Sequence, residues 1–225
     1  MQFYRVERRL STTLPAVGLM CRRLIAGASR QQRSLPNPMS ADTLRASGQS
    51  IILIGLMGAG KTSVGRKLAA NLGLSFIDAD EEIVEAAGCS IEDIFKVYGE
   101  QAFRDVEARV IARLLDEGPQ VLATGGGAYM DAFTRNLITE KGIVVWLRAE
   151  LDVLHRRTRR RGGRPLLETG NPRKTLQTLI NERYPIYGKA NIIVDTCEES
   201  ADVTVVKIVD ALPPEWNQQP REFRS

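Results

Sequence analysis

The stretch IILIGLMGAGKTSVGRKLA, residues 51–69, decides the fold of this chain. A short apolar run is followed by a glycine-rich turn, then by Lys61, Thr62 and a segment with apolar residues at four-residue spacing. This pattern is typical of a buried strand, a phosphate-binding loop of the type G-x-x-x-x-G-K-[ST], and a helix. Glycines let successive backbone N–H groups converge on an anion, and the helix adds the unpaired N–H groups of its first turn. The stretch therefore predicts a nucleotide-phosphate site.

Within this loop we assign the nucleotide phosphates to six consecutive residues, Gly58, Ala59, Gly60, Lys61, Thr62 and Ser63. Lys61 supplies a positive charge for the β- and γ-phosphates, so it is a candidate catalytic residue, and the Thr62 hydroxyl suits Mg²⁺. Motors, switches and small-molecule kinases all share this loop, so the motif alone leaves the phosphate acceptor open.

Composition and charge exclude several classes of protein. The chain has 225 residues, of which 43% are hydrophobic and 26% charged, as in an ordinary soluble globular domain. The net charge of +4 is uneven, because the first 50 residues carry eight Arg and two acids whereas the rest carries 23 basic and 25 acidic residues. We therefore expect no nucleic-acid partner for the body. No apolar run reaches the roughly 18–20 residues that span a bilayer, so we expect no membrane partner.

The cysteines and the histidine bear on compartment and chemistry. Cys21, Cys89 and Cys197 form no C-x-x-C pair, which favours reduced thiols in a cytoplasmic protein. His155 is the single histidine, which argues against Ser-His-Asp or metal–histidine chemistry.

Residues 1–49 differ from the rest of the chain. They are rich in Arg and Ser, poor in acids and interrupted by prolines. We predict either a disordered leader or a wrongly assigned start, with Met39 as the initiator, and trimming to Met39 should leave activity unchanged. The same composition is found in organelle transit peptides, which stays an alternative and would place the protein in an organelle.

From residue 50 onward, short apolar runs alternate with helical patterns. We predict strands over 51–55, 74–80, 120–128, 143–149 and 191–196, and helices over 61–73, 81–88, 90–118, 134–142, 150–160, 174–190 and 200–212. Residues 162–173 are predicted to be a loop, and 213–225 a C-terminal tail. Strands that alternate with helices and are apolar throughout favour one α/β domain over residues 50–212, with a parallel sheet covered on both faces.

The ends of the second and third strands are where an acceptor should bind. Asp78 and Asp80 are two apart, so in an extended segment they would point the same way, one toward an ion and one toward an acceptor hydroxyl. A capping pair for the next helix is the alternative. The third strand runs into residues 125–127, three glycines whose bare backbone lets a small ligand approach. No Asp ends that strand, so we expect Asp78 to supply the magnesium carboxylate.

Arginines complete the pattern. Arg104 and Glu107 are three apart on a helix, where an Arg held by an internal acid would be a fixed fork for a carboxylate; the alternative is an ordinary surface pair. A second arginine, Arg183, lies in RYPIY. Between them, HRRTRRRGGRPLL (155–167) reads either as a solvated basic face or as a hinged loop whose arginines close over the phosphates.

The phosphate loop, DAD, FRDVE, GGGA, RPLL and RYPIY, in this order and spacing, resemble the shikimate kinase family of bacterial type over about residues 50–212. The resemblance implies the P-loop nucleoside-monophosphate-kinase-like three-layer fold, with a five-stranded parallel sheet flanked by helices. It also implies a substrate-binding region at about 78–108 and a lid at about 156–170. The implied activity is ATP- and Mg²⁺-dependent phosphorylation of the 3-hydroxyl of shikimate, in the chorismate route to aromatic amino acids, by a monomer.

Carried over by position, the resemblance implies a role for each candidate residue. Asp80 would hold the shikimate hydroxyls near the attacking oxygen, as a base or only as an aligning group. The substrate would be bound by Arg104, Gly126 and Arg183, with Glu107 orienting Arg104. Asp78 would act through water on the Mg²⁺ bound by Thr62, Arg164 would reach the phosphates from the lid, and Arg157 would lie near the adenine.

Three other functions compete with this assignment. Gluconate kinase shares the loop and the fold and also takes a hydroxylated carboxylate. A nucleoside-monophosphate kinase would need a second base-reading pocket. A non-catalytic nucleotide-binding relative would lack the substrate-side residues, yet Asp80, Arg104 and Arg183 are all present.

Overall fold

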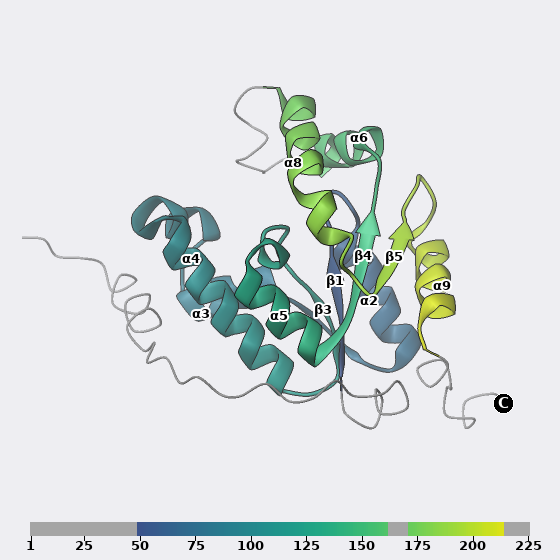
Figure 1. Cartoon of the computed structure of the whole chain (residues 1–225), viewed down its shortest axis with the longest axis horizontal. Coiled ribbons are helices and arrows are strands. Elements are labelled where there is room, and N and C mark those ends of the chain that lie inside the picture. Colours follow the sequence, from purple (N-terminus) through teal and green to yellow (C-terminus); the bar gives the residue numbers. More distant parts are fainter. Residues whose placement is uncertain (1–48, 162–170, 214–225) are drawn as a thin grey trace, which may run out of the picture.

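The computed structural model describes residues 49–161 and 171–213, with residues 160 and 161 described by their backbone alone. Its centre is a five-stranded sheet in the order β2-β3-β1-β4-β5, and every neighbouring pair is parallel (Figure 1). The strands are β1 (Ser50–Ile54), β2 (Ser75–Asp78), β3 (Gln120–Ala123), β4 (Gly142–Arg148) and β5 (Ile192–Asp195). The predicted fold class, a five-stranded parallel sheet flanked by helices, is confirmed.

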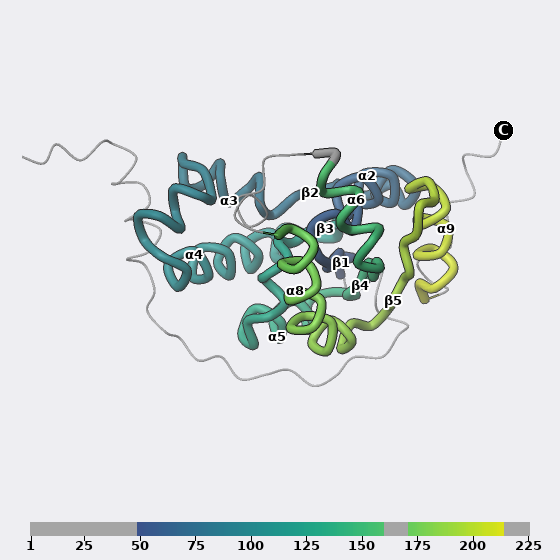
Figure 2. Tube along the Cα trace, turned by 90° about the horizontal axis from the view of Figure 1, so that it is seen from above, coloured from purple at the N-terminus to yellow at the C-terminus, as the bar shows by residue number. Residues whose placement is uncertain are grey.

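Helices cover both faces of this sheet. On one face lie α2 (Lys61–Leu72) and α9 (Ala201–Ala211), and on the other lie α4 (Ile91–Asp116) and α5 (Ala132–Lys141) (Figure 2). Helix α3 (Ala79–Ala87) and the first part of α4 project beyond the β2 edge, whereas α6 (Leu151–Arg161) and α8 (Pro172–Tyr187) lie beyond the ends to which the strands point. A short 3₁₀ turn, η2 (Ala128–Met130), follows β3.

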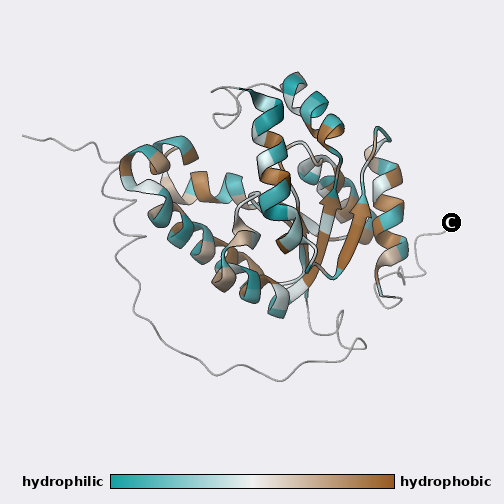
Figure 3. Ribbon diagram, turned by 45° about the horizontal axis from the view of Figure 1, so that its top comes forward, coloured by the Kyte–Doolittle hydropathy of each residue, from teal (hydrophilic) through white to brown (hydrophobic). Residues whose placement is uncertain are grey.

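The central strand β1 shows why the sheet is parallel and buried. All five of its residues are buried, and Ile52 pairs with Leu122 of β3 on one side and with Val144 of β4 on the other. A strand that is apolar on both faces is stable only where helices cover both faces. The strands are accordingly the most hydrophobic part of the fold, and polar residues gather on the outer faces of the helices (Figure 3).

The predicted strand–loop–helix unit at the start of the domain is confirmed. Strand β1 ends at Ile54, and α2 begins at Lys61 and stops at Gly73, whose φ of 64° is left-handed. Between them, Gly58 and Gly60 have φ values of 84° and 101°, which other residues adopt only at a cost. These two glycines turn the chain tightly enough for the N-terminus of α2 to face the ends of the strands.

The prediction for the second strand was wrong in its length. Strand β2 ends at Asp78 rather than at residue 80, and α3 begins at Ala79. Asp78 and Asp80 are therefore not in one extended segment, because Asp78 is the N-cap of α3 and Asp80 lies in its first turn. Both residues still line one pocket, but Asp78 does so from the end of β2 and Asp80 from the first turn of α3.

The long helix predicted over 90–118 is interrupted. Its N-cap is the expected one, since Ser90 Oγ accepts a hydrogen bond from the Asp93 N–H at 3.1 Å. At Gly99, however, φ is 81° and ψ is 176°, so the chain leaves helical geometry for one residue. Helix α8 also differs from the prediction, because it begins at Pro172 within the predicted loop; Pro is suited to a first turn, and Asn171 caps it.

Several predictions fall outside the described residues. These are the leader up to residue 48, the part of the predicted lid over 162–170 with Arg164, and the tail from 214. Within the described part of the chain, no helix combines the length and the apolar character needed to cross a bilayer.

Candidate active site

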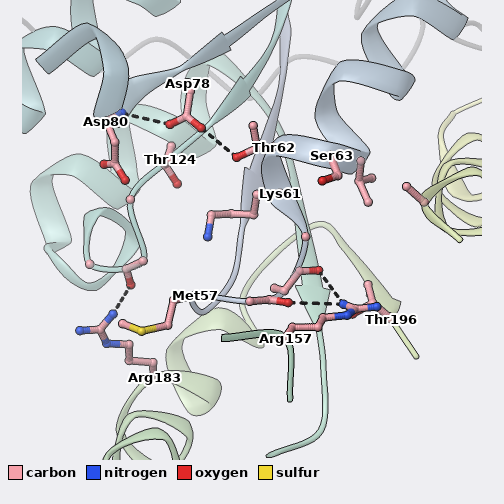
Figure 4. A pocket seen from close by; sticks show the side chains of 18 of the residues that line it. Met57, Lys61, Thr62, Ser63, Asp78, Asp80, Thr124, Arg157, Arg183 and Thr196 are labelled. Carbon is pink, nitrogen blue, oxygen red and sulfur yellow. Dashed lines mark hydrogen bonds between the residues drawn. The ribbon is translucent and has the colours of Figure 1, made fainter. Parts of the chain in front are cut away.

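A pocket of about 780 Å³ lies at the carboxyl ends of the strands. Figure 4 shows the phosphate loop and Lys61 in its middle, Asp80 and Arg183 toward one end, and Arg157 and Thr196 toward the other. All the predicted site residues that the structure describes line it: Gly58, Ala59, Gly60, Lys61, Thr62, Ser63, Asp78, Asp80, Arg104, Glu107, Gly126, Arg157 and Arg183. Of the predicted site residues, Arg164 alone lies outside the described residues.

The phosphate loop and the start of α2 form a site for an anion. The N-cap of α2 is Gly60, which makes no side-chain capping bond, and the first turn of the helix contains no acid. The positive dipole end of the helix thus has no capping side chain and no acid from its own first turn. Lys61 Nζ donates to the carbonyl oxygen of Gly55 at 2.8 Å and to that of Leu56 at 3.4 Å. The ammonium group is therefore held over the loop, next to the place where phosphates would bind.

Thr62 and Asp78 form a pair of oxygen ligands beside the loop. The Thr62 hydroxyl donates to Asp78 Oδ2 at 3.0 Å, and Asp78 Oδ1 accepts from the Asp80 N–H at 3.2 Å (Figure 4). Asp78 thus caps α3, which was the alternative to a role in ion binding, and its other oxygen accepts from Thr62 beside the loop. Within residues 49–161 and 171–213, no group of three or more His, Cys, Asp and Glu side chains is arranged to hold a metal. A hydroxyl and one carboxylate fit Mg²⁺, which takes its remaining ligands from phosphate and water.

The carboxylate of Asp80 shares a narrow space with Glu107. A Cβ built on Gly125 would lie 2.8 Å from Asp80 Oδ1 and 2.9 Å from Glu107 Oε1. Both carboxylates therefore approach the same stretch of bare backbone, which only glycine leaves open. From the sequence we expected these glycines to leave room for a ligand. At Gly125 the missing side chain also leaves room for the carboxylates of Asp80 and Glu107.

Arg104 is held in place by an internal acid, as the sequence predicted. Its Nη1 lies 2.6 Å from Glu107 Oε2, and Glu107 is only 2% exposed. A second acid, Glu100, approaches Nη2 at 3.2 Å from one turn away. Burial raises the pKa of Glu107, although the positive charge of Arg104 opposes this shift. Burial also favours the neutral form of Arg104, but the two glutamates outweigh it and raise its pKa. This buried pair is not the ordinary surface pair that was the alternative.

Gly126 links the third strand to α8. Its carbonyl oxygen accepts a hydrogen bond from Arg183 Nη1 at 2.7 Å and another from the hydroxyl of Tyr187. Tyr187 is 1% exposed, and burial raises its pKa, so the hydroxyl stays a donor. From the sequence we predicted a role for Arg183 of RYPIY but none for Tyr187. The signal was present in RYPIY, where Arg183 and Tyr187 are four residues apart and share one helical face.

The other end of the pocket is formed around Arg157. Its Nη1 lies 3.4 Å from the carbonyl oxygens of Gly58 and Ala59, and its Nη2 donates to the carbonyl oxygen of Cys197. Arg157 thus connects the phosphate loop to the segment after β5. Sequence reasoning missed the other polar residues at this end, Thr196, Glu199 and Thr204.

Comparison with known proteins decides the family. The family model for shikimate kinase matches residues 57–213. The chain belongs to the shikimate kinase family. A curated shikimate kinase from Paramagnetospirillum magneticum is 53% identical over 165 residues, which cover 73% of this chain and 85% of that protein. The prediction that this is an enzyme, a small-molecule kinase of the shikimate kinase family, is confirmed.

Solved structures agree with the sequence comparison. Shikimate kinase from Acinetobacter baumannii, solved in complex with shikimate, is 38% identical, has a TM-score of 0.71, and covers 76% of this chain and 97% of its own. A gluconokinase from Sinorhizobium meliloti also aligns, but at 22% identity and a TM-score of 0.50 over 76% of this chain and 94% of its own. That likeness shows a shared fold and nothing about the acceptor.

Proposed function

We propose that this enzyme transfers the γ-phosphoryl group of ATP to the 3-hydroxyl of shikimate, giving shikimate 3-phosphate and ADP in the chorismate route to aromatic amino acids. The observation that carries the proposal is that one pocket joins a phosphate loop to a pair of held arginines, Arg104 and Arg183, with the Asp80 carboxylate also lining it. Relatives at about half identity and a neighbouring structure with bound shikimate support the same acceptor.

The acceptor end suits a small hydroxylated carboxylate. Arg104 and Arg183 approach it from two different helices, and guanidinium groups bind carboxylates through paired hydrogen bonds. Their orientation is fixed by Glu107 and by the carbonyl oxygen of Gly126. With the substrate carboxylate held there, Asp80 accepts a hydrogen bond from the attacking hydroxyl and aligns it with the γ-phosphorus. Such positioning carries most of the catalysis in phosphoryl transfer, because the transition state is loose.

At the donor end the nucleotide phosphates bind to the loop from Gly58 to Ser63. Lys61 moves its donated hydrogen bonds from the loop carbonyls to the β- and γ-phosphates, so its charge meets the charge that develops in the transition state. Thr62 and, through water, Asp78 would hold Mg²⁺, which when bound neutralises phosphate charge. Arg157, which lines the pocket, would contact the adenine, and Arg164, which lies outside the described residues, would bind the phosphates.

The function is tested by a coupled assay of ADP release with shikimate, gluconate and AMP in parallel, in the presence of Mg²⁺. We expect turnover with shikimate and none above background with the other two acceptors. Turnover of gluconate without turnover of shikimate would overturn the assignment. We further propose that the enzyme acts as a cytoplasmic monomer without nucleic-acid or membrane partners, which sedimentation and cell fractionation test separately.

A further inference from the structure

The segment between β5 and α9 closes one end of the pocket. Arg157 and Thr196 lie toward that end, whereas Asp80 lies toward the opposite one (Figure 4). Glu199 also lines the pocket, close enough to Arg157 to feel its charge, and Thr204 of α9 is hydrogen-bonded to Glu199. Phosphates held by the loop must direct their γ end toward Asp80 for transfer, so the nucleoside extends the other way. With ATP bound as proposed above, the base of the nucleotide would lie toward Arg157, Thr196 and Glu199.

Glu199 is the acid at this end, and its carboxylate is fixed. Lys207 Nζ lies 2.7 Å from Oε1 and 2.8 Å from Oε2, and the Thr204 hydroxyl donates to Oε1 at 3.2 Å. The Glu199 side chain is 19% exposed. The Lys207 hydrogen bond lowers the pKa of Glu199, so the group is ionised at neutral pH. An ionised carboxylate accepts hydrogen bonds and donates none.

This carboxylate has room for another hydrogen bond. Two carboxylate oxygens offer about four acceptor positions. The bonds that Glu199 makes with described residues use two positions on Oε1 and one on Oε2. The neighbouring cation does not compete for the open position, because Arg157 donates instead to the carbonyl oxygens of Gly58, Ala59 and Cys197. The base end thus has an acceptor of fixed orientation.

We propose that Glu199 selects the base of the nucleotide, by accepting a hydrogen bond from the 6-amino group of adenine and repelling the 6-oxo group of guanine or hypoxanthine. An exocyclic amino group is a donor, and a 6-oxo group is an acceptor that would face negative charge. A site that hydrogen-bonds one group rejects an analogue with the opposite polarity more strongly than an apolar pocket does. This inference deepens the proposed function and rests on its use of ATP.

The test is binding of ADP and IDP to the full chain, by titration calorimetry with Mg²⁺ and without shikimate. We expect the wild type to bind ADP about ten- to a hundredfold tighter than IDP, the range for a hydrogen bond to a charged group. In Glu199→Gln the amide keeps the shape of the side chain and can donate to a 6-oxo group. We expect this variant to bind IDP more tightly than the wild type does, and the preference for ADP to fall about tenfold or more.

Two further variants distinguish selection of the base by Glu199 from a purely structural role of Glu199 in the segment between β5 and α9. Glu199→Ala should also lose the preference for ADP. Glu198→Ala is the matched control, because Glu198 is in the same loop but pairs with Arg156 with 64% of its side chain exposed, and it should keep the wild-type ratio. If Glu199→Ala and Glu199→Gln weaken both nucleotides equally, Glu199 only anchors the loop and the proposal is overturned. A wild type that does not distinguish ADP from IDP overturns it too.

The two proposals fail separately. The affinities for ADP and IDP are measured without an acceptor. Their ratio therefore tests the role of Glu199 whether or not the enzyme phosphorylates shikimate. Conversely, equal affinities for ADP and IDP would overturn the role of Glu199 but would not contradict the phosphorylation of shikimate by ATP.

Discussion

Arg104 lies directly against the α-carbon of Gly127. A Cβ built on Gly127 would be 2.7 Å from Arg104 Cζ and closer still to both terminal nitrogens. The backbone of Gly127 is ordinary, with φ of −100° and ψ of −20°, so alanine fits the backbone and only the space is missing. A side chain at position 127 would therefore have to displace the Arg104 guanidinium.

Replacing Gly127 with alanine should therefore act on the substrate through Arg104. We expect the displaced guanidinium to raise the KM for shikimate about tenfold or more, the loss of a charged hydrogen bond, with a smaller change in the KM for ATP. Steady-state kinetics with each substrate varied in turn measures both constants. Gly188→Ala is the control, because a Cβ there meets its nearest atom at 3.5 Å and φ is −59°. Equal effects of the two variants would show that Arg104 tolerates the methyl group.

Glu107→Gln should separate stability from function. Burial raises the pKa of Glu107 in the folded protein above its ordinary value of 4.5, so the folded state disfavours the ionised form. Relative to the neutral glutamine, the wild type therefore loses stability as the pH rises from about 4.5 through the raised pKa. We expect the melting temperature of the variant, minus that of the wild type, to increase over that interval and then level off. A difference that falls with pH would contradict the sign of the shift.

The same variant should bind the substrate poorly. A neutral amide holds the Arg104 guanidinium less firmly than a carboxylate, so we expect the KM for shikimate at pH 7.5 to rise about tenfold. The variant would thus gain stability relative to the wild type as the pH rises through the raised pKa, while its affinity for the substrate falls, and a purely structural role for Glu107 would not produce the loss of affinity. Measuring both quantities on one protein preparation makes the comparison direct.

Asp80→Asn is expected to leave the nucleotide site intact and remove turnover. Without the carboxylate, the attacking hydroxyl loses its charged acceptor, and we expect kcat to fall by about 10²–10⁴. The dissociation constant of ADP should stay within about twofold of the wild-type value. Asp105→Asn, on the exposed face of α4 where Asp105 accepts from Gln101 at 3.0 Å, should have no effect on either quantity. Activity near the wild-type level in Asp80→Asn would mean that the residue is structural.

Asp78→Asn should change the need for Mg²⁺. Asparagine still caps α3, but it removes the negative charge beside Thr62. We expect the Mg²⁺ concentration for half-maximal activity to rise about tenfold, the usual cost of losing a partner of a metal ligand. Asp131→Asn makes the same exchange at the N-cap of α5, where Asp131 accepts from the Thr134 N–H at 2.8 Å, and should leave the Mg²⁺ dependence unchanged. A parallel rise in both variants would point to capping rather than to the metal.

Much of the fold and the site followed from the sequence because strong local patterns carry them. The loop from Gly55 to Thr62 is fixed by glycines with left-handed φ, and FRDVE places Arg104 beside Glu107 wherever that helix lies. The ends of parallel strands meet at one edge of the sheet, so residues 78–80 and 125–127 had to face the loop.

Other features depend on the tertiary structure and left little signal. Gly99 sits between two good helical patterns, and an isolated glycine is tolerated in a helix, so its non-helical φ was not visible. Asp78 and Asp80 read as an extended pair because the sequence does not mark the change from strand to helix at residue 79. Glu199 lies in a polar loop, and only the fold brings it into the pocket, with Lys207 holding it from the next helix.

The order β2-β3-β1-β4-β5 places β1 between two sets of functional groups. Asp78, Asp80 and the glycine run follow β2 and β3, whereas Arg157 and Thr196 follow β4 and β5. In the proposed function, the acceptor end and the end that takes the base would therefore be built from separate stretches of chain. Arg183 is the exception, since α8 carries it from the β4–β5 side back to Gly126. A change of acceptor in this fold thus has to alter two distant stretches of the chain together, one around Arg104 and one around Arg183.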